Sequence, residues 1–153
     1  MQGKIMNKDN YIFFWGGVFS NFYQVDTKET SEKWFMLEKA AFFKDSDSYK
    51  AIIKTSHPRD AKKLGRKVSG FNEKEWNGFK ETAMMNSLRR KYRECEPFKE
   101  ALDASEHKIL VEASPYDRIW GIGFGVDEAL DNINDWGQNL LGECLMKLRK
   151  EMR

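Results

Sequence analysis

Residues 73–93, EKEWNGFKETAMMNSLRRKYR, carry the strongest secondary-structure pattern in the chain. Asn72 and Glu75 resemble a capping box at the start of this segment. The apolar side chains that follow recur at helical spacing and form one stripe: Trp76, Phe79, Ala83, Met84, Leu88 and Tyr92. The pattern predicts a long helix from about Glu73 to Arg93.

Helical patterns also dominate the rest of the chain. We expect shorter helices over residues 31–43, 48–54, 58–68, 97–103, 127–132 and 139–150. Ser31 is expected to cap the first of these, and Pro58 suits the first turn of the third. Extended structure is limited to residues 108–113 and to residues 11–23, where Gly16–Gly17 favours a short hairpin or an irregular extended start. The fold class is therefore mostly α, a multihelical, irregular array with a small β element.

Length and charge limit the possible functions. A chain of 153 residues suits a single compact domain, residues 1–153, with one core. Its 26 basic and 24 acidic side chains leave a net charge of +2, which argues against a general nucleic-acid binder but allows a local basic pocket. Aromatic residues make up 14%, a high share that indicates an aromatic core or rings lining a pocket.

Cysteine and histidine usage narrows the chemistry further. Cys95 and Cys144 have no metal-ligand spacing, and we expect no signal peptide and no membrane span, so they suit reduced thiols of a cytoplasmic protein. His57 and His107 are the only histidines, which disfavours a histidine-rich metal site or a Ser-His-Asp triad. Any acid–base chemistry is expected to use carboxylates, lysine or tyrosine, with no metal.

Residues 110–125, LVEASPYDRIWGIGFG, place a carboxylate and a flat ring beside open backbone. Asp117 and Trp120 precede Gly121, and two more glycines follow, an order that suits presentation of a charge and a stacking face to a small ligand. A tight turn with Trp120 in the core explains the same pattern equally well. The glycine spacing is not that of a dinucleotide-binding loop.

Residues 31–43 contain a second set of candidate functional side chains. Glu32, Phe35 or Met36, and Lys39 fall on one face of the expected helix, where an acid–base or nucleophile pair could flank a ring. The alternative is a solvated helix whose charges face water. The apolar neighbours, Trp34 among them, favour a packed helix.

Two further segments suit a phosphorylated ligand. Residues 61–68, AKKLGRKV, gather four cations that could hold a phosphate, although a cationic helix end is an equal alternative. Asn21 and Phe22 could contact a nucleobase or ribose edge, whereas turn formation is the plainer explanation of the asparagine. Core packing is the default role of Trp76.

In order along the chain, FFWGGVFSNFY, SEKWFMLEKAAFF, AKKLGRKV, Trp76 with LRRKY, LVEASPYDRIWGIG and WGQNLLGECLMKLR resemble the NADAR (YbiA-like) family. The resemblance runs from about Ile12 to Arg149. It implies a small, mostly helical fold and an N-glycosidase acting on a ribosylated substrate. The substrates implied are an ADP-ribosylated guanine or a phosphoribosylamino-pyrimidine intermediate of riboflavin synthesis.

The resemblance also implies roles for individual residues. It makes Glu32, Lys39 and Asp117 catalytic. The substrate-binding set comprises Asn21, Phe22, Arg66, Trp76, Trp120, Gly121 and Asn139, with Gly65 and Gly142 as matched glycines. The sequence departs from the family pattern at Lys33, where a histidine is usual, at Ala104-Ser105 and Glu94-Cys95, and in a short segment between Tyr23 and Ser31. Lys33 bears on substrate choice more than on reaction type.

The implied reaction passes through an oxocarbenium-like state and needs no cofactor. Glu32 or Asp117 would stabilise charge and activate water, or Lys39 would attack C1 as an amine if burial lowers its pKa. The partner is a nucleotide-like small molecule or an ADP-ribosylated nucleic acid, and the sequence leaves the oligomeric state open. A non-catalytic ADP-ribose-binding module and a purely structural or interaction protein are the alternative functions.

Overall fold

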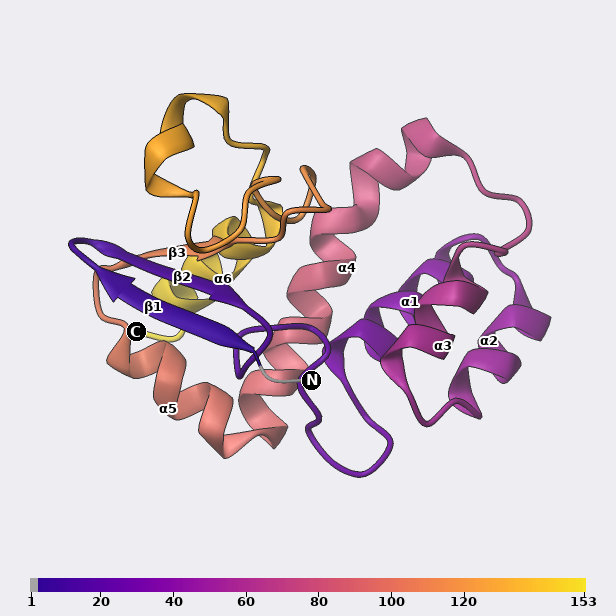
Figure 1. Cartoon of the computed structure of the whole chain (residues 1–153). Helices are drawn as coiled ribbons and strands as arrows, with labels where there is room; N and C mark the ends of the chain where they lie inside the picture. The colour runs from indigo at the N-terminus through magenta and orange to yellow at the C-terminus, as the bar shows by residue number, and fades with distance from the viewer. Residues whose placement is uncertain (1–2) are drawn as a thin grey trace. The chain divides into compact units, whose positions relative to one another are not determined.

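The computed structural model describes residues 3–153, which form two compact units. Unit 1 comprises residues 3–20 and Glu96–Arg153, and unit 2 comprises Asn21–Cys95. The described residues contain six α-helices, one 3₁₀ helix and three strands, which confirms a mostly helical chain with a small β element (Figure 1). The expectation of one domain stays a prediction.

Unit 1 contains the sheet. Strand β1 (Lys4–Lys8) pairs antiparallel with β2 (Tyr11–Trp15), and β3 (Ile109–Glu112) pairs parallel with β2 on its other side. The central position of β2 explains why three successive residues, Ile12 to Phe14, are buried. Of the two alternatives for residues 11–23, the irregular extended start is correct, because β2 is followed by turns and its hairpin partner is β1, a mostly exposed edge strand with little apolar patterning.

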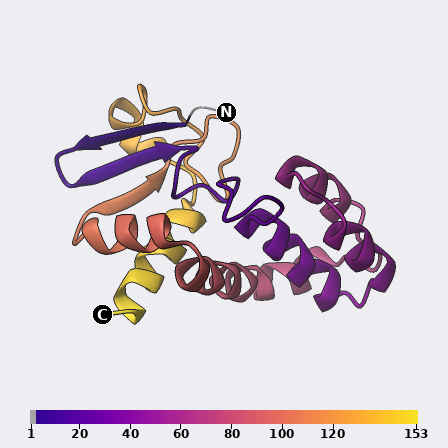
Figure 2. The ribbon, with the colours of Figure 1, turned by 90° about the horizontal axis from the view of Figure 1, so that it is seen from below.

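Three helices complete unit 1: α5 (Glu96–Ala104), the 3₁₀ helix η1 (Leu130–Asp135) and α6 (Leu140–Glu151). The helix expected over residues 127–132 lies three residues further on and is of the 3₁₀ type. Helix α6 packs along β3 (Figure 2). The approach is so close that a Cβ atom on Gly142 would overlap the carbonyl oxygen of Leu110.

Unit 2 is a four-helix array built around α1 (Ser31–Phe42), which packs against α2 (Ser46–Ile53), α3 (Pro58–Gly65) and α4 (Glu73–Glu94) (Figure 1). Local signals set these boundaries. The side chain of Asn72 caps α4 by accepting a hydrogen bond from the Glu75 N–H at 2.9 Å, as its capping-box pattern predicted. The N-cap of α1 is Thr30 rather than Ser31, whose hydroxyl donates instead to Asn21.

The last residue of α3, Gly65, lies directly against α1. A Cβ atom at this position would overlap Sδ of the buried Met36 and come within 3.0 Å of its Cγ. Only a residue without a side chain allows the end of α3 to approach α1 this closely, which fixes where Arg66 leaves the helix.

Gly65→Ala is expected to lower the free energy of unfolding by about 1–3 kcal/mol, because Met36 must move within a packed core. Gly78→Ala is the matched control. A Cβ atom at Gly78 meets nothing within 4 Å, so this helical substitution should raise stability by about 0.5–1 kcal/mol. Chemical denaturation of both variants measures the difference, and equal effects of the two substitutions would contradict the close α1–α3 contact.

Candidate active site

Lys39 is the centre of a charged cluster in unit 2. Its ammonium group lies 4.8 Å from the centre of the Phe71 ring and 5.7 Å from that of Trp76. Burial lowers the pKa of Lys39, the Glu32 carboxylate opposes that shift, and the Arg66 guanidinium lowers the pKa further. The structure therefore brings together four residues that the sequence predicted for the site: Glu32, Lys39, Arg66 and Trp76.

The helices explain how these groups meet. Glu32 and Lys39 are seven residues apart in α1, two turns, and so share one face of the helix. Glu32 is buried, and its backbone N–H donates to the Asn21 carbonyl oxygen at 3.0 Å. Arg66 follows the last residue of α3, and its side chain is exposed. An exposed guanidinium beside a partly buried amine suits contact with an anionic group of a ligand.

Trp76 contributes to the core as well as to the cluster. It is buried, and its ring lies 5.4 Å from that of Phe35 and packs with Phe42 and Phe43. The default interpretation as a core residue is correct, yet the same ring faces the ammonium group of Lys39. Sequence reasoning missed Phe71, which follows a loop glycine and carries no periodic signal.

Asn21 and Phe22 lie at the entrance to α1. The Asn21 side-chain oxygen accepts a hydrogen bond from the Ser31 hydroxyl at 2.8 Å, and its amide nitrogen donates to Met84 Sδ at 3.6 Å. Phe22 lies below the ammonium group of Lys62, 5.9 Å from it. Asn21 thus holds the start of α1 in place, while Phe22 adjoins the cationic helix α3. Their contact with a substrate stays a prediction.

The remaining predicted residues lie in unit 1. Asp117 Oδ1 accepts hydrogen bonds from the backbone N–H groups of Ile119 at 2.8 Å and Trp120 at 2.9 Å, which closes a turn. A Cβ atom at Gly121 would lie 2.8 Å from the Glu112 carbonyl oxygen, so this turn packs against the end of β3. The tight-turn interpretation of residues 110–125 is confirmed for the backbone, and Trp120 is only half-buried.

Asn139 supports the sheet of unit 1 through both ends of its side-chain amide. Its Nδ2 donates to the Leu110 carbonyl oxygen at 2.9 Å, and its Oδ1 accepts from the Glu112 N–H at 2.9 Å. The residue adopts a left-handed conformation with φ of 52° directly before α6. Its amide therefore binds the backbone of β3, and its predicted contact with substrate stays untested.

Lys33, at a position where the resemblance led us to expect a histidine, is buried in α1. Its ammonium group donates to the Thr55 carbonyl oxygen at 3.0 Å and lies 3.5 Å from a carboxylate oxygen of Glu29. The lysine joins α1 to the end of α2 and to the short segment before α1. Lys33 therefore has a structural role in this chain through its contacts with Thr55 and Glu29.

Within residues 3–153, no group of three or more His, Cys, Asp or Glu side chains is placed to hold a metal ion. The same residues contain no helix that is both long and apolar enough to cross a bilayer.

The sequence profile of the NADAR domain matches residues 13–153, nearly the whole chain. The chain belongs to the NADAR family. N-glycosidase R617 of Acanthamoeba polyphaga mimivirus is 35% identical, with 95% of this chain and 98% of the relative covered. N-glycosidase YbiA of Escherichia coli strain K12 is 33% identical, with coverage of 99% and 91%.

A solved structure extends the similarity to the fold. The NMR structure of the E. coli protein YbiA superposes with a TM-score of 0.72 at 32% identity, covering 96% of this chain and 87% of the other. Named N-glycosidases among the relatives of this NADAR protein support an N-glycosidase role and place it among glycosyl hydrolases.

The opposing charges around Lys39 predict opposite effects of two substitutions on its pKa. Glu32→Gln removes the negative charge that raises this pKa and should lower it further, whereas Arg66→Gln removes a positive charge and should raise it. Titration of the labelled Lys39 side chain by NMR measures both shifts, with Lys67→Gln as a control for loss of a nearby exposed cation. Shifts in the same direction for Glu32→Gln and Arg66→Gln would contradict the arrangement.

Proposed function

We propose that this chain hydrolyses the N-glycosidic bond between ribose and a base in a phosphorylated, nucleotide-like substrate. The cluster around Lys39 is the observation that carries the proposal. A partly buried amine with a lowered pKa, flanked by the Glu32 carboxylate and aromatic rings, has the character of a nucleophile or of a charged anchor for a reacting sugar. The names of the relatives, N-glycosidases, support the type of bond.

In the route that the cluster favours, the neutral amine of Lys39 attacks C1 of the ribose. The electron pair of the breaking C–N bond leaves with the base. The Glu32 carboxylate accepts the proton released by the attached lysine nitrogen and transfers it to the departing base. Opening of the ribose ring then gives a Schiff base, to which water adds at C1 and displaces Lys39. The net reaction consumes one water and yields the free base and the ribosyl product.

A second route keeps Lys39 charged. Glu32 removes a proton from water, which attacks C1 as the base departs through an oxocarbenium-like state. Both routes use Glu32, and they differ in whether substrate becomes covalently attached to Lys39. A trapping experiment separates them.

Substrate binding is assigned to the groups that surround the reacting amine. Arg66, with Lys62 one turn earlier, offers cations for a phosphate, and Phe71 and Trp76 offer ring faces for the sugar or base. ADP-ribosylated guanine and a phosphoribosylamino-pyrimidine both carry the required phosphate and ribose–base bond. A non-catalytic ADP-ribose-binding module would retain Arg66 and Trp76 without needing the Glu32–Lys39 pair.

The test is incubation of the protein with ADP-ribosylated guanine, as nucleoside and in DNA, and with phosphoribosylamino-pyrimidines, followed by mass spectrometry of the released base. Glu32→Gln and Lys39→Met are expected to lower turnover at least about a hundredfold. Borohydride added during turnover should leave a reduced ribosyl adduct on Lys39 if the covalent route operates. Binding without base release would establish the binding-module alternative.

Asp117 can be tested separately for its charge and for its turn. Asp117→Asn retains an oxygen that can accept both backbone hydrogen bonds, so the variant should fold normally while turnover falls at least about a hundredfold. Asp117→Ala loses both bonds and should also lower the unfolding free energy by about 1–3 kcal/mol. Turnover and denaturation are measured for both, and normal turnover of Asp117→Asn would restrict Asp117 to the turn.

A further inference from the structure

The Phe71 ring is a partly exposed aromatic group beside the candidate catalytic amine. Phe71 is 47% exposed, yet its ring centre lies 4.8 Å from the ammonium group of Lys39 and 5.4 Å from the ring of Phe43. Burial alone does not fix a ring that is exposed to this extent, because much of its surface contacts water rather than packed neighbours. The backbone that carries Phe71 therefore decides whether the ring stays over Lys39.

Asp45 ties that backbone to the end of α1. Its Oδ2 accepts a hydrogen bond from the Ser69 backbone N–H at 2.9 Å, and its own backbone N–H donates to the Ala40 carbonyl oxygen at 2.9 Å. Gly70 follows Ser69 in a left-handed conformation, with φ of 76°, and lies beside the Phe43 carbonyl oxygen. The loop is thus anchored two residues before Phe71 and turns along the end of α1.

The two carboxylate oxygens of Asp45 make different contacts. Oδ1 caps α2 by accepting from the Ser48 backbone N–H at 3.0 Å, whereas Oδ2 accepts from the Ser48 hydroxyl at 2.5 Å and from the Ser69 N–H. The hydrogen bonds from Ser48, and then that from Ser69, hold the pKa of the Asp45 carboxyl well below its usual range. A helix cap needs only one oxygen, so the bond to Ser69 is a separate contribution of this side chain.

We propose that Asp45 is a positioning residue for the reaction at Lys39, because through Ser69 and Gly70 it holds the Phe71 ring against the amine. The rings of Phe71 and Trp76 together restrict the directions from which a sugar carbon can reach Nζ of Lys39. The effect on turnover rests on the N-glycosidase reaction proposed for Lys39. The placement of the ring does not.

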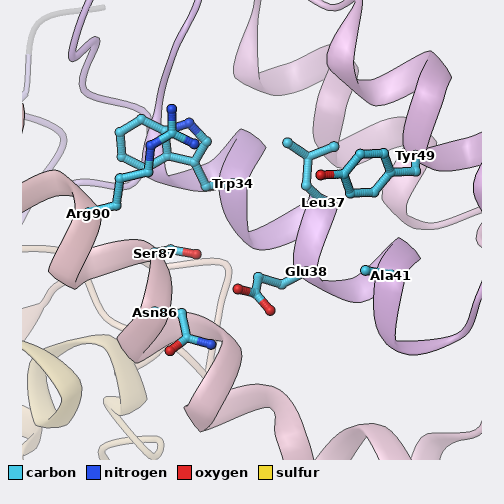
Figure 3. A pocket seen from close by; sticks show the side chains of 8 residues that line it. All are labelled: Trp34, Leu37, Glu38, Ala41, Tyr49, Asn86, Ser87 and Arg90. Atoms are coloured by element: carbon cyan, nitrogen blue, oxygen red, sulfur yellow. The ribbon is translucent and has the colours of Figure 1, made fainter.

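The opposite side of α1 supplies a control position. It borders a cavity of about 230 Å³ between α1, α2 and α4, where Glu38 points toward Asn86 and Ser87 of α4 (Figure 3). Glu38 is adjacent to Lys39 in the sequence but lies away from the loop that carries Phe71. Asp47, exposed in the first turn of α2, supplies a second control, because its loss removes the same charge as loss of Asp45.

The first test measures the position of the ring without an enzyme assay. Asp45→Ser keeps an oxygen that can cap α2 but is too short to reach Ser69 as well. In NMR spectra of the full chain, the ε-methylene proton signal of Lys39 should move in the same direction as in Phe71→Leu, because the ring current of Phe71 is lost in both variants. Asp47→Ser and Glu38→Gln should leave the signal in place.

Asp45→Asn is a second variant that keeps the size of the side chain. With its oxygen at the α2 cap, it places an amide donor opposite the Ser69 N–H and should move the Lys39 signal in the same direction as Asp45→Ser. An unmoved Lys39 signal in both Asp45 variants, or an equal movement in Asp47→Ser, would overturn the proposal.

A kinetic cycle separates positioning from general stability. Asp45→Ser and Phe71→Leu are each expected to lower kcat/KM about tenfold, and the double variant should lose no more than Phe71→Leu alone, because both changes act through the same ring. Losses that multiply in the double variant would overturn the proposal. A wild-type chain that releases no base, with the Lys39 signal still displaced in Asp45→Ser, would refute the reaction at Lys39 and support the placement of the ring.

Discussion

The close contact of α3 with α1 at Gly65 is the constraint on which the Lys39 cluster depends. Met36 occupies the space that any side chain at this position would need, so α3 can end against α1 only because the residue is glycine. As a consequence, the next residue, Arg66, lies close enough to Lys39 to lower its pKa. A packing requirement between two helices thus adds a positive charge to a site whose largest influence on the Lys39 pKa is burial.

That electrostatic balance suits an amine that must lose and regain a proton. Burial and Arg66 both lower the pKa of Lys39, while Glu32 raises it, so the cluster holds the amine between two opposing influences. A stronger carboxylate interaction alone would keep the lysine fully protonated and unable to attack a sugar. The same carboxylate provides a nearby acceptor for the proton that attack on C1 releases.

Helix periodicity made part of this site predictable. Glu32 and Lys39 were found because two turns of α1 place them on one face, and the first residues of α3 and α4 followed from Pro58 and Asn72, although α3 ends three residues earlier than expected. The adjacent Glu38 shows the limit of that reasoning. Glu38 and Lys39 are neighbours in the sequence, yet they serve different faces of α1, a distinction that depends on which helices pack against each side.

Helix periodicity could not predict the contacts between segments that are distant in the sequence. Phe71 approaches Lys39 from a loop without periodicity, and strand β1 was missed because its edge position leaves it mostly exposed. Asn139 bonds to Leu110 and Glu112, nearly 30 residues earlier, so no local signal could reveal its role. Nonlocal hydrogen bonds of this kind become visible only when the fold is known.

The turn that Asp117 closes is compatible with the chemical role proposed for its carboxylate. Its Oδ1 is fixed by two backbone N–H groups, so the orientation of the whole carboxylate, including Oδ2, is set by the turn rather than by solvent. A carboxylate that stabilises developing positive charge is most effective when its orientation is fixed before the reaction begins. The turn that Asp117 closes therefore gives its carboxylate the fixed orientation that a charge-stabilising group requires. Asp117→Asn removes the charge but keeps the hydrogen bonds, and so distinguishes a role in catalysis from a role in the turn alone.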